Sequence, residues 1–166
     1  DRGAKVLVVE RKVYLADATD VTEIVVKDTR KAMAAAAANF YDHPSKDLAL
    51  VGITGTNGKT TTTYLVEHIA RVAGKRTGVI GTVGIRDEAE KSAHTTPESP
   101  DLQQLFARMR DARCDVVAME VSSHALDLDR TWDAAFAVTA FSNLTQDHLD
   151  YHHTFEAYFE AKARLF

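Results

Sequence analysis

The stretch from Leu48 to Thr63, LALVGITGTNGKTTTT, decides the fold of this chain. Its first half predicts a β-strand, and the segment from Thr60 to Ala73 predicts a helix that ends at Gly74. A strand, a glycine-rich turn and a helix in this order form a phosphate-binding unit, because the N-terminus of the helix attracts an anion. We therefore expect a nucleotide-binding site at the end of this strand.

The glycine-rich turn contains the residue types that phosphate binding requires. Gly55 and Gly58 allow the backbone to curve closely around an anion, so that its N–H groups face it. Lys59 can neutralise phosphate charge, and the Thr60 hydroxyl can bind Mg²⁺. Ile53 stands where the strict GxxxxGK(S/T) pattern has its first glycine. A glycine-rich turn that binds no ligand is therefore the alternative interpretation.

A further magnesium ligand is expected on a neighbouring strand. The segment VVAME is apolar up to Glu120, which would lie at the carboxyl edge of a parallel strand. Ligands bind at this edge in doubly wound sheets, so the nearby phosphate loop favours a metal ligand over a solvated acid. ATP with Mg²⁺ is the cofactor pair that these residues imply.

Predicted strands and helices alternate along the rest of this region, which favours a parallel sheet. A charged segment at residues 86–91 predicts a solvated turn, and a further helix begins at Ser99. A last helix covers residues 154–166. The expected strands cover residues 48–55, 77–85, 116–123 and 134–141.

The sequence before the phosphate-binding unit has a different pattern of residues. Two short β-branched runs, at residues 6–9 and 23–26, suit buried strands, and the alanine-rich segment at 30–41 predicts a helix. The sequence His43-Pro44 ends that helix and marks the domain boundary. The fold class is therefore α/β: a P-loop mononucleotide-binding parallel sheet flanked by helices, preceded by part of a smaller α/β domain.

Composition excludes several classes of protein. The chain has 166 residues, a formal net charge of −4 and one cysteine, which favours a reducing, cytoplasmic setting. No apolar run approaches the roughly 20 residues that span a bilayer, and the mild acidity argues against nucleic-acid binding. Because the chain begins at Asp1 and ends at Phe166 within an apolar helical stripe, we expect a piece of a longer protein.

A dense group of acids and histidines follows the strand at 134–141. Oxygen and imidazole ligands at this density can hold a cation or orient a phosphate. A helix-capping aspartate with surface histidines fits the composition equally well. The sequon Asn143-Leu144-Thr145 receives no role, since nothing suggests secretion. The group consists of Asp147, His148, Asp150, His152 and His153.

The last helix places Lys162 on an apolar stripe with Phe155, Tyr158, Phe159 and Phe166. One interpretation is a lysine that extends its ammonium to solvent near the helix C-terminus. The other is chemical, because partial burial lowers a lysine pKa and a neutral amine reacts with CO₂. The resulting carbamate is an anion that can lie beside Mg²⁺.

Five ordered motifs resemble the Mur ligase family: GTNGKTT, HTTPES, MEVSSHAL, SNLTQDHLDYH and YFEAKARLF. The resemblance covers essentially the whole chain. It implies that residues 1–44 are the C-terminal part of an N-terminal domain that binds the UDP-substrate. Residues 45–166 would then be the first part of the central ATP-binding domain, with its remainder and the C-terminal domain absent.

The resemblance also implies roles for individual residues. Lys162 matches the lysine that the family carbamylates to support a second metal, and Leu128 and His94 depart from the pattern of some relatives. The implied ATP-binding residues are Gly55, Thr56, Asn57, Gly58, Lys59, Thr60 and Thr61. The implied metal ligands are Thr60, Glu120 and His148. The implied substrate-binding residues are Thr95, Thr96, Ser122 and Arg130.

The implied reaction is ATP-dependent amide formation in peptidoglycan biosynthesis. The ligase would add meso-diaminopimelate or L-lysine to UDP-MurNAc-L-Ala-D-Glu through an acyl phosphate. By the same resemblance the full-length protein would be a cytoplasmic monomer, and this piece would be inactive by itself.

Three alternatives stay open. A folylpolyglutamate synthetase shares the fold and a similar phosphate loop, although HTTPES and EVSSHAL fit the muramyl-peptide branch better. A P-loop phosphotransferase would transfer phosphate without forming an amide, and the lysine at 162 argues against it. The third is a chain that binds nucleotide without catalysis.

Overall fold

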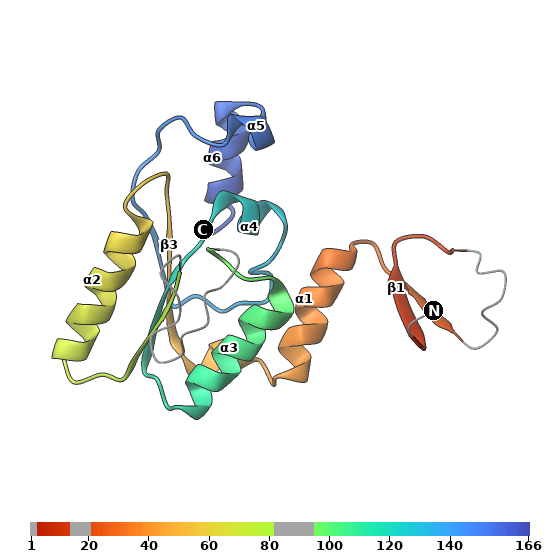
Figure 1. The fold of residues 1–166 in the computed structure, drawn as a ribbon, viewed down its shortest axis with the longest axis horizontal. Helices are drawn as coiled ribbons and strands as arrows, with labels where there is room; N and C mark the ends of the chain where they lie inside the picture. Colours follow the sequence, from red (N-terminus) through yellow and green to blue (C-terminus); the bar gives the residue numbers. More distant parts are fainter. Residues whose placement is uncertain (1–2, 14–20, 82–94) are drawn as a thin grey trace.

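A parallel four-stranded sheet organises the chain, as Figure 1 shows. The computed structural model describes residues 3–13, 21–81 and 95–166. The strand order is β4-β5-β3-β6, so that the strand leading into the glycine-rich turn lies inside the sheet. The predicted α/β class with a parallel sheet is thereby confirmed. The strands are β3 (Ala49–Thr54), β4 (Thr77–Ile80), β5 (Val116–Glu120) and β6 (Val138–Phe141).

Helices cover both faces of this sheet. Side chains alternate along β5, so Met119 joins the apolar cluster with α3 while Glu120 meets Thr60 of α2 on the opposite face. The predicted helix after the glycine-rich turn and the one beginning at Ser99 are both present. The helices are α2 (Lys59–Val72), α3 (Ser99–Asp111), α4 (Ser123–Asp127), α5 (Leu149–His152) and α6 (Phe155–Ala163).

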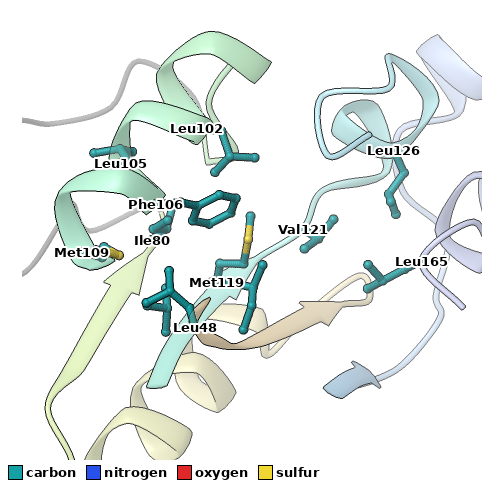
Figure 2. Packing of buried hydrophobic residues seen from close by; sticks show 12 residues of the cluster. Leu48, Ile80, Leu102, Leu105, Phe106, Met109, Met119, Val121, Leu126 and Leu165 are labelled. Atoms are coloured by element: carbon teal, nitrogen blue, oxygen red, sulfur yellow. The ribbon is translucent and has the colours of Figure 1, made fainter. Parts of the chain in front are cut away.

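The apolar face of α3 forms the core with β4 and β5. Figure 2 shows Phe106 and Leu102 of α3 pointing toward Met119 of β5. The side chains of Leu102, Phe106 and Met119 are 0% exposed. Gly78 leaves room for this helix, because a Cβ there would lie 2.9 Å from the Met109 sulfur and that side chain would have to shift.

A small parallel pair of strands precedes the main sheet: β1 (Val6–Val9) and β2 (Thr22–Val25). Helix α1 (Thr29–Phe40) follows, with Asp28 capping it by accepting bonds from the first-turn backbone, and a 3₁₀ turn, η1 (Pro44–Asp47), leads into β3. The prediction that β1 and β2 are buried is wrong. Val6, Val8, Ile24 and Val25 are about half exposed, and in the described part of the chain α1 is the element that makes the main contact with β1 outside the pair itself.

Other parts of the prediction also differ from the structure. The segment expected as a core strand from 134 to 141 forms a strand only over Val138–Phe141, at the edge of the sheet. Just before it, Ala137 N donates to Leu50 O of β3, and Ala135 N donates to the Ser45 hydroxyl. The predictions for residues 82–94, including the charged turn and His94, lie outside the described residues.

In the described ranges, no helix has both the length and the apolar character needed to cross a membrane.

The packing of α3 leads to a stability prediction. Phe106→Ala should lower the free energy of unfolding by about 3–5 kcal/mol, because it leaves a cavity where a fully buried ring contacts the sheet. Phe40→Ala removes the same atoms from a side chain that is 80% exposed and should change stability by less than about 0.5 kcal/mol. Urea denaturation of the two variants measures both values. Equal losses would contradict the assignment of this core.

Candidate functional site

The phosphate loop has a backbone that only glycine adopts easily. Gly55 has φ 139° and Gly58 has φ 81°, both in the region that side chains disfavour. A Cβ on Gly55 would collide with the Ser142 hydroxyl and lie 3.0 Å from the Asn143 carbonyl oxygen. The N–H groups of the first turn of α2 have no partner within the helix, so they are available to an anion at this point.

A second loop, following β6, fixes the phosphate loop from outside. The Asn143 side chain accepts a hydrogen bond from Asn57 N at 3.0 Å and donates to Asn57 O at 2.9 Å. The backbone N–H of Thr145 donates to the Thr56 hydroxyl at 3.0 Å, and that hydroxyl also bonds the Tyr158 hydroxyl at 3.0 Å. The two loops meet because β3 and β6 are neighbouring parallel strands that end at one edge.

Two lysines share one carbonyl of the phosphate loop. Lys59 Nζ and Lys162 Nζ each donate to Gly55 O at 2.8 Å, and Lys59 Nζ also donates to Thr56 O at 2.9 Å. Lys162 is 1% exposed, with its ammonium 4.5 Å from the centre of the Tyr158 ring. Of the two interpretations of this lysine, the buried side chain agrees with the structure, and the alternative of an ammonium extended to solvent is wrong.

The electrostatics of this pair follow from its burial. Burial, and then the positive charge of Lys59, lowers the pKa of Lys162 to about 8, while Asp147 acts in the opposite direction. Burial also lowers the pKa of Lys59, against the charges of Glu120 and Asp147. Two lysine side chains with little access to solvent therefore lie beside one loop, and an anion bound there would be attracted to both.

The stripe predicted around Lys162 is only partly buried. Tyr158 is buried, whereas Phe155 and Phe159 of α6 and Phe166 beyond its end are exposed. Phe159 and Phe166 instead contact the ring of Phe141 on the edge strand β6. The helical spacing predicts all five residues on one stripe, but α6 packs mainly against α4 and α5, and only Tyr158 and Lys162 of that stripe are buried.

Two of the expected metal ligands are in contact. The Thr60 hydroxyl donates to Glu120 Oε2 at 2.9 Å, and Glu120 is 2% exposed. Gly81 makes room for this carboxylate, because a Cβ there would collide with Glu120 Oε1. A hydroxyl and a buried carboxylate at the mouth of a phosphate loop are hard oxygen ligands of the kind that Mg²⁺ binds. In the described part of the chain, no group of three or more His, Cys, Asp or Glu side chains is arranged as a metal site.

The histidine-rich segment divides into buried and exposed members. His152 is 7% exposed and its Nε2 lies 3.0 Å from the Ser123 hydroxyl, while His124 lies 4.8 Å from His148 between ring centres. Burial is the main cause that lowers the pKa of His124 and of His152. His148 is the more exposed ring and packs against the same Tyr158 ring that Lys162 contacts.

The residues expected to bind the second substrate gather where β5 ends. The buried Thr96 hydroxyl donates to Glu120 O at 3.0 Å and accepts from Ser122 N at 3.1 Å. Arg130 donates through Nη1 to Thr96 O at 3.1 Å and pairs with Glu98 at 2.8 Å. The Ser122 hydroxyl caps α4 by accepting from the backbone of the helix. Thr95 is half-buried beside this group.

The structure therefore brings the predicted residues to one edge of the sheet and adds others that sequence reasoning missed. Asn143 and Thr145 were set aside as part of a sequon, and Glu98 received no role. The signal that identifies the first two is their position directly after a strand that neighbours β3. The missed residues with contacts in the site are Ser142, Asn143, Thr145, Tyr158, Glu98 and Arg30.

Known proteins resemble this chain in sequence and in fold. The chain is 50% identical over 168 residues to the UDP-N-acetylmuramoyl-L-alanyl-D-glutamate--2,6-diaminopimelate ligase of Bacillus licheniformis, with 100% of this chain and 34% of the relative covered. A solved structure of a UDP-N-acetylmuramoyl-L-alanyl-D-glutamate--2,6-diaminopimelate ligase has a TM-score of 0.79 and 31% identity over 95% of this chain and 32% of that one. E. coli FolC in complex with DHPP and ADP has a TM-score of 0.62 and 23% identity over 86% of this chain and 40% of FolC, which shows a shared fold alone.

The chain spans about a third of the length of the curated relatives that it matches. Residues 53–166 match the family model described as the Mur ligase middle domain, which is more than half of the chain. The phosphate loop, Glu120 and Lys162 all lie inside this matched region. The chain therefore belongs to the Mur ligase family.

Proposed function

We propose that this chain is part of an ATP-dependent ligase that joins 2,6-diaminopimelate to UDP-MurNAc-L-Ala-D-Glu in peptidoglycan biosynthesis. The observation that carries the proposal is the 50% identity, across the whole chain, to a ligase named for that reaction. Residues 1–44 would contribute to the domain that binds the UDP-substrate, and residues 45–166 would form part of the ATP-binding domain. The activity belongs to the full-length protein, and we expect the 166-residue chain alone not to ligate.

The residues present fit a nucleoside triphosphate with Mg²⁺. The curved backbone at Gly55 and Gly58 and the N-terminus of α2 suit phosphate oxygens. Thr60 and Glu120, already in contact, would hold one Mg²⁺. His148 would hold a second, supported by a carbamate on Lys162. When bound, Mg²⁺ supplies positive charge that offsets the repulsion between a carboxylate and a phosphate.

The side chains divide the work of such a reaction. Lys59 would exchange its two carbonyl partners for phosphate oxygens, which are stronger acceptors. Ser122 and Arg130 would hold the muramyl-peptide substrate beside Glu120. The D-glutamyl carboxylate attacks the γ-phosphate, ADP leaves, and the amine of the diamino acid then displaces phosphate from the acyl phosphate. The chain thus has to hold two anions together, which explains its concentration of positive charge at one sheet edge.

A product assay tests the proposed function. The full-length protein is incubated with ATP, Mg²⁺, UDP-MurNAc-L-Ala-D-Glu and either meso-diaminopimelate or L-lysine. We expect the diaminopimelate tripeptide, ADP and phosphate in equal amounts. ADP formation without an amide product would favour a phosphotransferase, and extension of a folate with glutamate would favour a folylpolyglutamate synthetase.

The phosphate loop leads to a prediction for Lys59. In the full-length protein, Lys59→Ala should lower ligation by at least about a hundredfold, because it removes the side chain that neutralises phosphate charge. The matched control is Lys75→Ala, which removes an exposed lysine just beyond the end of the same helix. Turnover and circular dichroism are measured for both. A Lys59→Ala protein that is folded and ligates like the control would contradict the assignment of the phosphate loop.

The burial of Lys162 leads to a prediction about pH. Only a neutral amine reacts with CO₂, and a pKa of about 8 means that the neutral fraction of Lys162 rises steeply between pH 7 and 9. At fixed ¹³C-bicarbonate, the carbamate signal in ¹³C NMR should therefore grow by about tenfold over this range. The signal should disappear in Lys162→Met and persist in Lys75→Gln. A signal of unchanged intensity in Lys162→Met would contradict carbamylation at this residue.

A further inference from the structure

Arg30 and Arg130 share the carboxylate of Glu98. Arg130 Nη2 lies 2.8 Å from Glu98 Oε1, and Arg30 Nη2 lies 2.9 Å from Glu98 Oε2. Each guanidinium therefore has its own carboxylate oxygen. Arg130 is the more buried of the two, with a side chain that is 11% exposed against 38% for Arg30. Glu98 is thus a bridge between a residue expected to bind substrate and one on α1.

The bridge joins parts of the chain that are distant in sequence. Arg30 lies in the first turn of α1, within the predicted N-terminal unit, whereas Glu98 and Arg130 lie in the matched Mur ligase region. Arg30 Nε also donates to the Leu128 carbonyl at 2.6 Å, two residues before Arg130. Helix α1 packs beside α3, as Figure 1 shows, so this contact continues an existing packed surface.

The bridge leaves positive charge at the site. Two guanidinium groups face one carboxylate, so the group has a surplus of one positive charge. Two further carboxylates close by in sequence are already engaged: Asp127 accepts from the Tyr151 hydroxyl at 2.8 Å and pairs with Arg164 at 3.7 Å, and Asp129 also pairs with Arg164. Without Arg30, the Glu98 carboxylate would be balanced by Arg130 alone, and that arginine would attract an anion less strongly.

We propose that Arg30 is a positioning residue for Arg130, acting through Glu98 and leaving Arg130 with net positive charge for the carboxylate-bearing substrate. The inference rests on the proposed function, because it takes UDP-MurNAc-L-Ala-D-Glu as the anion that Arg130 holds. It gives α1 a part in substrate binding although Arg30 itself need not touch the substrate. The phosphate loop follows β3, whereas this bridge lies near the end of β5 and contacts the phosphate loop only indirectly, through Thr96 and Glu120.

Calorimetry on the full-length protein tests the inference with two ligands. Arg30→Gln should raise the dissociation constant for UDP-MurNAc-L-Ala-D-Glu by about tenfold and leave that for Mg²⁺–ATP within about twofold. In a Glu98→Gln background, adding Arg30→Gln should change the substrate constant by less than about twofold, because the partner through which Arg30 acts is gone. Lys31→Gln, which removes the same charge one residue along α1, should bind both ligands like the parent.

Each contrary result has a distinct meaning. Three results would overturn the inference if the parent protein still binds substrate and ligates. The dissociation constant for UDP-MurNAc-L-Ala-D-Glu could be unchanged in Arg30→Gln, or the constants for substrate and Mg²⁺–ATP could rise equally. The third is a tenfold rise of the substrate constant when Arg30→Gln is added to the Glu98→Gln variant. A parent protein that binds no muramyl-peptide substrate would refute the proposed function, and it would also refute the proposed role of Arg30, which depends on that function.

Discussion

The backbone of the phosphate loop is held in its curved form by side chains from another loop, and the geometry of the site depends on this contact. A loop with two glycines at positive φ has many other conformations available and would lose considerable entropy on binding an anion. The Asn143 amide reduces that loss by bonding both polar groups of the Asn57 peptide backbone. Because β3 and β6 are parallel neighbours, the strand order itself places the supporting loop at the right distance.

The same edge of the sheet concentrates charge that the isolated chain balances only partly. Lys59 and Lys162 donate to one carbonyl oxygen, and burial disfavours the charged form of both. Under the proposed function, the phosphate oxygens of a triphosphate would pair with the Lys59 ammonium, while a carbamate on Lys162 would remove the second positive charge. At the adjacent end of β5, the Arg30–Glu98–Arg130 bridge repeats this principle with a surplus positive charge. Basic side chains therefore gather at two neighbouring strand ends, and the proposed function assigns one anionic substrate to each.

Sequence reasoning predicted the local parts of this site and missed the long-range ones. The phosphate loop and the position of Glu120 follow from short patterns, because each depends on where a strand ends. The apolar stripe of the last helix left two alternatives for Lys162, and its burial decides between them. Asn143 contacts Asn57, which is 86 residues away in sequence, only because β6 pairs with β3. No local periodicity in the sequence encodes that pairing. The predicted burial of β1 and β2 failed for a similar reason: β-branched composition indicates a strand but not what covers it.

The central claim is that the loop from Gly55 to Thr61, supported by Asn143, binds the phosphates of ATP. Titration of this ¹⁵N-labelled chain with Mg²⁺–ATP, followed by backbone amide chemical shifts, tests it residue by residue. The account predicts that the largest shifts fall on Gly55–Thr61 and Asn143, and that the amides of β1 and β2 do not move. Saturating nucleotide that leaves the Gly55–Thr61 amides unchanged, or that shifts mainly residues away from this sheet edge, would contradict it.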